Sequence, residues 1–184
     1  ALSKAKLVTN QVEYHPYLSQ TPVYDYAVEH GMFLTAYSPL ARGKINDDKD
    51  LAAAFIAQTN LDTSITNPYA FSGSEVLLKK FGEGFYKGIT VTCPGFFGPQ
   101  GRVLRLPLSS PALVDKLTHF SFNNHRITNF EMETSAIFGL GKLMGHECMS
   151  VNAIIANRIV KEFSKDSNVA VEKLIAKALD ALTS

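Results

Sequence analysis

The sequence contains no tryptophan and only two cysteines, and none of its apolar stretches is long. A membrane-spanning helix needs about 20 apolar residues, so we expect no membrane segment and no membrane partner. A disulfide framework would need more thiols than Cys93 and Cys148, which we therefore predict to be buried free thiols in a reducing compartment. A net charge of +1 gives no electrostatic reason to bind nucleic acid. Because the first residues lack the apolar segment of a secretory signal, we expect a cytoplasmic protein.

Common nucleotide and metal motifs are also missing. The five histidines are scattered without the spacing of a metal site, so we expect no metal. The chain carries no GxGxxG, no P-loop and no GxSxG motif. Apolar residues make up 46% of the 184 residues and charged residues 19%, a balance typical of a globular protein that can bury a sizeable core.

What is present is an alternation of strand and helix patterns. We predict strands over 6–14, 32–38, 61–66, 88–93, 125–130 and 147–156, and helices over 22–30, 51–57, 73–81, 131–144 and 168–182, with another helix opening at Ser110 and Pro111. Alternation of this kind predicts an α/β fold, a three-layer sandwich with a mostly parallel, mixed sheet and helices on both faces. In such sheets ligands bind beyond the carboxyl ends of the strands.

The loop after the strand at 88–93 has a useful chemistry. It carries the Phe96 ring, the Gln100 carboxamide and the Arg102 guanidinium on a stretch rich in proline and glycine. A carboxamide pairs with a base edge that shows both a donor and an acceptor, a guanidinium donates to carbonyl oxygens, and a phenyl ring stacks on a heterocycle. Together they suit a pyrimidine such as uracil. The alternative is an ordinary loop with exposed polar tips.

Two further features lie near predicted strand ends. Glu131 and Glu133 stand at the start of a predicted helix, where they either cap the helix or accept hydrogen bonds from sugar hydroxyls. Arg158 follows an apolar run and is either a ligand contact or a surface arginine. We expect the strands 88–93 and 147–156 to share one sheet, which would bring Arg158 to the same pocket as the loop.

Residues 7–43 resemble a segment of the aldo-keto reductase family, through NQVEYHPYLSQ and FLTAYSPLARG. That family is a TIM barrel that uses NADPH. The resemblance implies that Gln11 corresponds to the glutamine that binds the nicotinamide carboxamide. It likewise relates Tyr37 to the aromatic residue stacked on the nicotinamide, and Ser38 to a residue near the pyrophosphate. The family's catalytic Asp, Tyr, Lys and His motifs are not found in this sequence, so we expect no cofactor to be used.

Residues from about 46 to 184 resemble the second half of the nucleoside phosphorylase family, and within it the uridine phosphorylases. FFGPQGR, ITNFEMETSAIFGLGKLMG and NAIIANR carry this resemblance. It implies three groups of substrate-binding residues. The uracil-reading group is Phe96, Gln100 and Arg102. The ribose group is Met132 and Glu133, with Glu131 as the preceding acid of the same motif. The group beside the base is the apolar pair Ile155 and Ala156, with Arg158 near a base oxygen.

Two resemblances in one chain predict a chimera. Residues 1–44 form its reductase-like strand–helix–strand unit, and residues 45–184 its phosphorylase-like half, packed as one domain. An engineered fusion, a natural fusion and a composite of two sequences are all open. The phosphorylase family holds phosphate with groups of its first half, which is replaced here, so we expect uridine binding without turnover.

Two other functions remain open. The first is an active pyrimidine-nucleoside phosphorylase, converting uridine and phosphate to uracil and ribose 1-phosphate. The second and weaker one is an NADPH-dependent reductase. The partners we expect are uridine, phosphate and further copies of the chain in a homo-oligomer.

Overall fold

The computed structural model describes residues 9–13, 18–37, 46–64, 66–82 and 84–183, without the side chains of 9, 11–13 and 34–37. The strands are β1 (Thr9–Glu13), β2 (Phe33–Tyr37), β3 (Ile89–Thr92), β4 (Ser121–Phe122), β5 (His125–Glu131), β6 (Ala156–Asn157) and β7 (Glu162–Phe163). The helices are α1 (Thr21–Glu29), α2 (Lys49–Thr59), α3 (Glu75–Lys80), α4 (Leu113–His119), α5 (Thr134–Leu143) and α6 (Ser167–Thr183), with a 3₁₀ turn at Gly98–Gln100. The predicted α/β class is confirmed.

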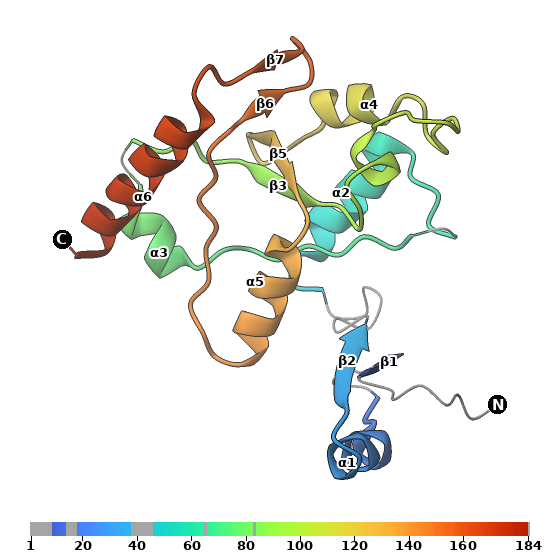
Figure 1. Ribbon diagram of the computed structural model, residues 1–184. Helices are drawn as coiled ribbons and strands as arrows, with labels where there is room; N and C mark the ends of the chain where they lie inside the picture. The colour runs from blue at the N-terminus through green and yellow to red at the C-terminus, as the bar shows by residue number, and fades with distance from the viewer. Residues whose placement is uncertain (1–8, 14–17, 38–45, 65, 83, 184) are drawn as a thin grey trace.

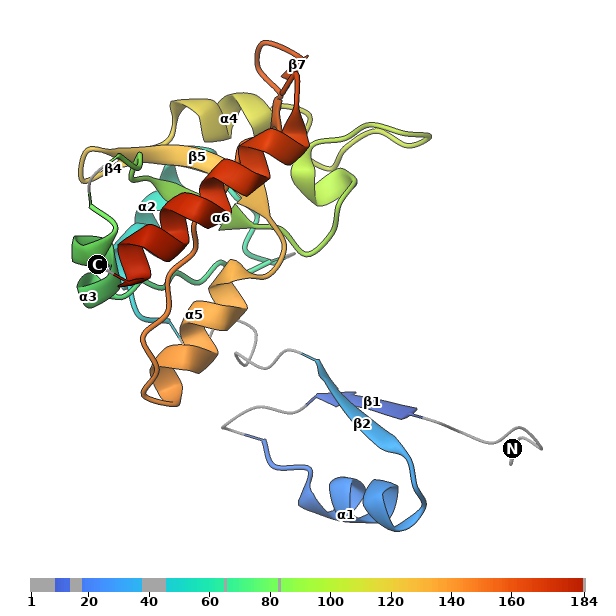
Figure 2. The same cartoon turned by 60° about the vertical axis from the view of Figure 1, so that its left-hand side comes forward.

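The first unit is a parallel strand pair with a crossover helix. β1 and β2 run parallel in register, with Thr9 opposite Phe33 and Glu13 opposite Tyr37. Between them α1 carries proline in its first turn, where a missing N–H costs nothing, and Gly31 follows in the left-handed region at φ +62°. In both views this unit lies apart from the other described elements (Figures 1 and 2).

The second sheet is mixed and carries the functional candidates. β5 is its middle strand, parallel to β3 and antiparallel to β4. The β3–β5 pairing shifts register between Ile89 and Thr90, after which Thr92 lies opposite Glu131. Because β3 and β5 are parallel, their carboxyl ends meet at the same edge, where Cys93 N donates to Glu131 O at 2.8 Å.

Helices flank this sheet on both sides. In Figure 2, α6 passes in front of the sheet and α2 lies behind it. The most buried large side chain is Phe120, 1% exposed, which meets Phe55 of α2 edge-on with the ring centroids 5.4 Å apart. Inside α5, Gly141 lies so close to Cys148 that a Cβ atom there would collide with the sulfur. The core is small, and many large apolar side chains remain exposed.

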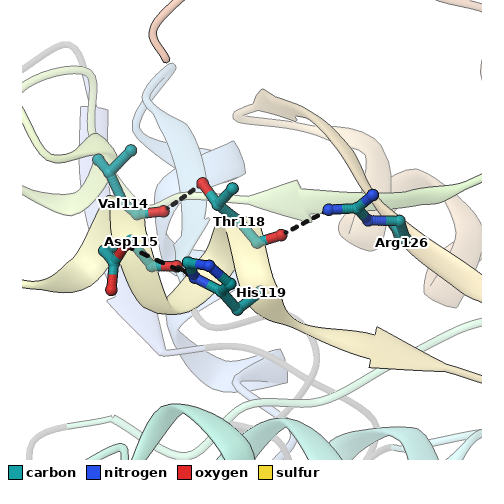
Figure 3. A network of polar contacts seen from close by, with 5 residues as sticks. All are labelled: Val114, Asp115, Thr118, His119 and Arg126. Carbon is teal, nitrogen blue, oxygen red and sulfur yellow. Dashed lines mark hydrogen bonds and ion pairs between the residues drawn. The ribbon is translucent and has the colours of Figure 1, made fainter.

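The C-terminus of α4 is closed by side chains (Figure 3). Arg126 Nη2 donates to the carbonyl oxygen of Thr118 at 3.2 Å, and Thr118 Oγ1 donates to Val114 O at 2.7 Å. His119 Nδ1 lies 2.8 Å from Asp115 O and 3.5 Å from the Asp115 carboxylate. A cation at this end of a helix satisfies carbonyls without intrahelical partners and opposes the helix dipole. The network ties α4 to β5.

Helix α6 is apolar on two adjacent stripes. Ala170, Leu174, Ala178 and Ala181 form the partly covered stripe. Val171, Ile175, Leu179 and Leu182 form the second stripe, which we call the outer stripe of α6, and they are 40%, 53%, 55% and 50% exposed. A spacing of four and three residues places the outer-stripe residues on one helix face. The helix therefore presents an apolar face to solvent.

Three expectations about the elements are wrong. The strand predicted over 147–156 is reduced to β6, which pairs with β7 and not with β3. Residues 61–64 and 66 are not a strand. Glu131, placed in a helix over 131–144, is the last residue of β5, and α5 begins at Thr134. Within the described residues, no helix has the length and apolar character to cross a membrane.

Candidate functional site

The loop after β3 is held in a tight turn. Gly98–Gln100 forms one 3₁₀ turn, and Arg102 N donates to Phe97 O at 3.0 Å. Gly101 sits at φ +76°, and a Cβ atom there would come within 2.6 Å of a Val114 methyl group. Glycine is therefore required on two counts, by its backbone angle and by its neighbour. The turn buries Gln100, which is 4% exposed.

Two guanidinium groups converge on the Gln100 side chain. Arg102 Nη1 donates to Gln100 Oε1 at 2.7 Å, and Arg158 Nη2 donates to the same oxygen at 2.6 Å. Arg158 Nη1 also donates to the Gln100 carbonyl oxygen, and Arg102 Nη1 to the Phe96 carbonyl oxygen. The turn between β6 and β7 supplies Arg158, so two distant segments meet at one carboxamide. We call Gln100, Arg102 and Arg158 the arginine–glutamine cluster.

Aromatic rings cover the faces of both guanidinium groups. Arg102 Cζ lies 3.6 Å from the centroid of the Phe96 ring, and Arg158 Cζ lies 5.0 Å from that of Phe130. A guanidinium stacked in this way keeps its N–H groups at the edge, available to oxygen acceptors. Phe130 was not among the residues predicted for the site. The alternation of side chains along β5 could have drawn attention to Phe130, because it must lie on the opposite face of the strand from Glu131.

The electrostatics of the cluster reflect two neighbouring cations. Burial lowers the pKa of Arg158, and the positive charge of Arg102 lowers it further. Nearby, burial raises the pKa of the Cys93 thiol to about 11, the two arginines opposing this rise and Glu131 adding to it. Cys93 and Cys148 are both free thiols, but only Cys93 is buried as expected, and Cys148 is half-buried. Among the described residues, no group of three His, Cys, Asp or Glu side chains gathers as metal ligands.

Glu131 closes the N-terminus of α5. Its Oε2 accepts from Glu133 N at 2.6 Å and from Thr134 N at 2.5 Å, and its other carboxylate oxygen accepts from the Thr92 hydroxyl. Thr92 Oγ1 in turn accepts from Ser135 N at 3.0 Å. Burial alone would raise the pKa of Glu131, but these hydrogen bonds lower it overall. The geometry matches the capping interpretation of Glu131.

The remaining phosphorylase-like residues are exposed, two of them directly after β5 and two where β6 begins. Met132 and Ile155 are 42% and 36% exposed, and Glu133 and Ala156 are exposed as well. An open groove of about 760 Å³ lies beside Arg102, lined by the loop from Phe97 to Ser109. The structure thus brings Gln100, Arg102 and Arg158 into direct contact, whereas within the described residues the side chains of Met132, Glu133, Ile155 and Ala156 make no hydrogen bond to the cluster.

The reductase-like residues lie on the first unit. Gln11 is in the middle of β1, opposite Thr35, and Tyr37 ends β2. Their side chains and the whole of Ser38 lie outside the described residues. The strand register places Gln11 and Tyr37 on neighbouring parallel strands.

Both resemblances appear in comparisons with known proteins. The model of the aldo/keto reductase family matches residues 1–78, past the predicted junction at residues 44 and 45. Aldose reductase B of Dictyostelium discoideum is 52% identical over 42 residues, which cover 23% of this chain and 14% of that protein. Aldo-keto reductase family 1 member D1 of Mus musculus is 30% identical over 97 residues, covering 53% of this chain and 29% of that protein.

The second similarity is to a phosphorylase. Uridine phosphorylase of Thermococcus kodakarensis is 30% identical over 107 residues, 56% of this chain and 37% of that protein. The shares matched by this enzyme and by the mouse reductase together exceed the whole chain, so the two similarities overlap along the sequence. No solved structure was found to match the chain. The chain spans less than two-fifths of each of these three relatives and is similar to two enzyme families at once.

Proposed function

We propose that this chain binds a pyrimidine nucleoside, with uridine as the representative ligand, through the arginine–glutamine cluster. The observation that carries this proposal is the convergence of Arg102 and Arg158 on one buried carboxamide at the carboxyl end of β3. Ligands of α/β sheets bind at such edges. The similarity to a uridine phosphorylase supports the same ligand class.

A uracil ring carries hydrogen-bonding groups of the same kind as those that already pair within the cluster. The Gln100 carboxamide oxygen occupies the donors of both arginines. A uracil carbonyl oxygen is an acceptor of the same kind and can take that place. The freed carboxamide then pairs with the N3–H donor and an adjacent carbonyl oxygen of the base, and the half-exposed Phe97 offers a ring face for stacking.

The ribose contacts belong to the turn between β5 and α5. Glu131 fixes this turn through the backbone N–H groups of Glu133 and Thr134. Met132 and Glu133 are exposed on it, so a carboxylate and a thioether face solvent where a sugar could be held. We assign hydroxyl binding to Glu133, because an ionised carboxylate accepts two hydrogen bonds from neighbouring hydroxyls. Ile155 and Ala156 are proposed as the apolar side of the base.

We further propose a fusion of two parts that does not catalyse phosphorolysis by itself. Catalysis requires phosphate held against the anomeric carbon by fixed cations, and the phosphorylase family supplies these from a first half that this sequence does not resemble. The matches to two families support a fusion. Mass measurement of the intact protein, with peptide mapping across Arg42–Asp50, tests it. We also propose a reducing, cytoplasmic location, in keeping with the two free thiols.

The function is tested by calorimetric titration of uridine and by an absorbance assay with uridine and phosphate. Saturable uridine binding without uracil release is the expected result. Absence of binding up to millimolar uridine would refute the proposal. Phosphate-dependent uracil release would establish turnover and replace it with the active-phosphorylase alternative.

One observation favours a second function. The match of the aldo/keto reductase family model to residues 1–78 supports NADPH-dependent carbonyl reduction. Gln11 and Tyr37 are the candidate nicotinamide contacts, together with Ser38. This function ranks lower because the family's catalytic Asp, Tyr, Lys and His motifs are not found in the sequence; an assay of NADPH oxidation with aldehydes tests it.

A further inference from the structure

We propose that Arg102 and Arg158 form a binding site for a small tetrahedral oxyanion such as inorganic phosphate. The inference adds a ligand class to the cluster described above, and its test needs no nucleoside. Both guanidinium groups donate to Gln100 Oε1, at 2.7 and 2.6 Å, so the two donating nitrogen atoms cannot be farther apart than these distances combined. Two positive groups are thus held together at one point.

The acceptors that hold the two cations together are all neutral. They are the Gln100 carboxamide oxygen and the backbone carbonyl oxygens of Gln100 and Phe96. Within the described part of the chain, neither guanidinium has a carboxylate partner at ion-pair distance. Hydrogen bonds to neutral oxygens do not offset the repulsion between two cations, whereas one anion does so for both.

The Glu131 carboxylate, which lies near the two arginines, already accepts hydrogen bonds from other groups. Glu131 acts on the same Cys93 thiol as the two arginines, and so it lies in the same region. Its oxygens accept from Thr92, Glu133 N and Thr134 N. Because these donors occupy both carboxylate oxygens, Glu131 cannot turn to an arginine without uncapping α5.

The geometry of the guanidinium groups favours an oxyanion over a flat cation or an apolar ligand. Phe96 and Phe130 cover their faces and leave the N–H edges for acceptors. Arginine binds phosphate oxygens through its N–H edge, and here the N–H edges of two guanidinium groups meet at one oxygen. A phosphate oxygen replacing Gln100 Oε1 meets both edges at once. The groove beside Arg102 offers the remaining oxygens access to solvent.

Calorimetric titration of sodium phosphate, at an ionic strength held constant with sodium chloride, tests the proposal. We expect saturable binding by the unaltered chain and a loss of about tenfold or more in affinity for Arg158→Gln, since a charge-assisted hydrogen bond is removed. Lys173→Gln is the matched control. It removes one positive charge from an exposed position of α6 that does not line the groove, and should bind phosphate within twofold of the unaltered chain.

Competition with other anions and a second Arg158 variant distinguish specific phosphate binding from a general effect of charge or of misfolding. Sulfate should displace phosphate, and added chloride at the same ionic strength should not. If Arg158→Gln does not fold by circular dichroism, Arg158→Lys keeps the charge but removes the fork, and should also weaken phosphate binding. Equal affinity in the unaltered chain, the Arg158 variant and Lys173→Gln would overturn the proposal, as would no binding at all. Uridine binding without phosphate binding refutes this inference alone, and phosphate binding without uridine binding refutes the proposed function alone.

Discussion

The guanidinium of Arg158 donates to both oxygen atoms of Gln100, a residue 58 positions earlier in the chain. The contact joins the β6–β7 turn to the loop after β3. It rests on a side chain that is 4% exposed, so water does not compete strongly for it. The candidate site therefore depends on long-range packing and not on one local motif.

Replacing Arg102 should weaken uridine binding. Arg102→Ala removes a charged donor from the cluster, which costs roughly 1.5–3 kcal/mol, or about one to two orders of magnitude in affinity. Calorimetry with uridine measures the change. Arg105→Ala, altered at an exposed position three residues away, is the control and should retain affinity. Equal uridine affinity in the unaltered chain and Arg102→Ala would show that the loop does not read the base.

Glu131 should stabilise the fold at neutral pH and lose this effect in acid. Its pKa in the folded chain lies below the ordinary value of 4.5. A group with a lowered folded pKa contributes stability above its unfolded pKa and loses it as the pH falls through the folded pKa. Glu131→Gln should lower the free energy of unfolding at pH 7 by about 0.5–2 kcal/mol, as loss of a helix cap does.

Urea unfolding from pH 7 down to pH 3 checks the Glu131 prediction. The unaltered chain should lose stability in acid more steeply than Glu131→Gln. The control is Glu133→Gln, whose exposed side chain does not cap α5, and which should follow the unaltered chain. Parallel pH profiles for all three proteins would contradict the assignment.

Cys93 should resist alkylation in the folded chain. Its side chain is 3% exposed and its thiol pKa is about 11, so at pH 8 only about one thiol in a thousand is the reactive thiolate. Iodoacetamide should modify the half-buried Cys148 first, and urea should remove the difference. Peptide mass analysis after timed labelling measures both rates. Equal rates in the folded chain would contradict the burial of Cys93.

The outer stripe of α6 should mediate self-association. Four apolar side chains between 40% and 55% exposed form one helix face, and covering such a face removes apolar surface from water. Light scattering at high micromolar concentration should show species larger than the monomer. Ile175→Glu should shift the distribution toward monomer, whereas Ala176→Glu, off the stripe on the same helix, should not. A strict monomer in the unaltered chain would contradict the expectation.

The chain should not oxidise NADPH with any aldehyde. The reason is the missing Asp, Tyr, Lys and His motifs of the aldo-keto reductase family, which the similarity of residues 1–78 does not replace. Loss of absorbance at 340 nm, the wavelength at which NADPH absorbs, is the measurement. A rate that survives repurification and disappears in Tyr37→Ala would establish the reductase function instead.

Periodic patterns predicted most elements, and unpatterned apolar runs did not. The helical spacing in 168–182 and the mixed pattern of 125–130 correspond to α6 and β5. The run around Val151, Ile154 and Ile155 has β-branched residues but no partner strand before β6 begins at Ala156, although Ile155 O accepts from Ser164 N at 2.7 Å. Composition alone cannot supply that partner, because pairing depends on the rest of the fold.

The chemistry of the site could be predicted from the sequence, but the contacts between its residues could be predicted only in part. The residue types in the loop indicated base recognition, and Gln100 and Arg102 do contact each other. Arg158 was expected at the same pocket as the loop because strands 88–93 and 147–156 were expected to share a sheet, but it reaches Gln100 from the turn between β6 and β7, which belong to another sheet. Thr92 was missed as the partner of Glu131, although strand alternation places every second residue of β3 on one face.

The buried carboxamide of Gln100 has a kinetic and thermodynamic consequence for anything that enters the cluster. Its oxygen acts as a tethered competitor, present at the arginine donors at high effective concentration because the chain itself holds it there. A ligand oxygen can bind to the two arginines only after the Gln100 oxygen has been released from them. The apparent affinity is then the intrinsic affinity reduced by the fraction of molecules in which the carboxamide has turned away. A shorter side chain at position 100 would remove that competition and reveal how strongly the two arginines hold an oxygen by themselves.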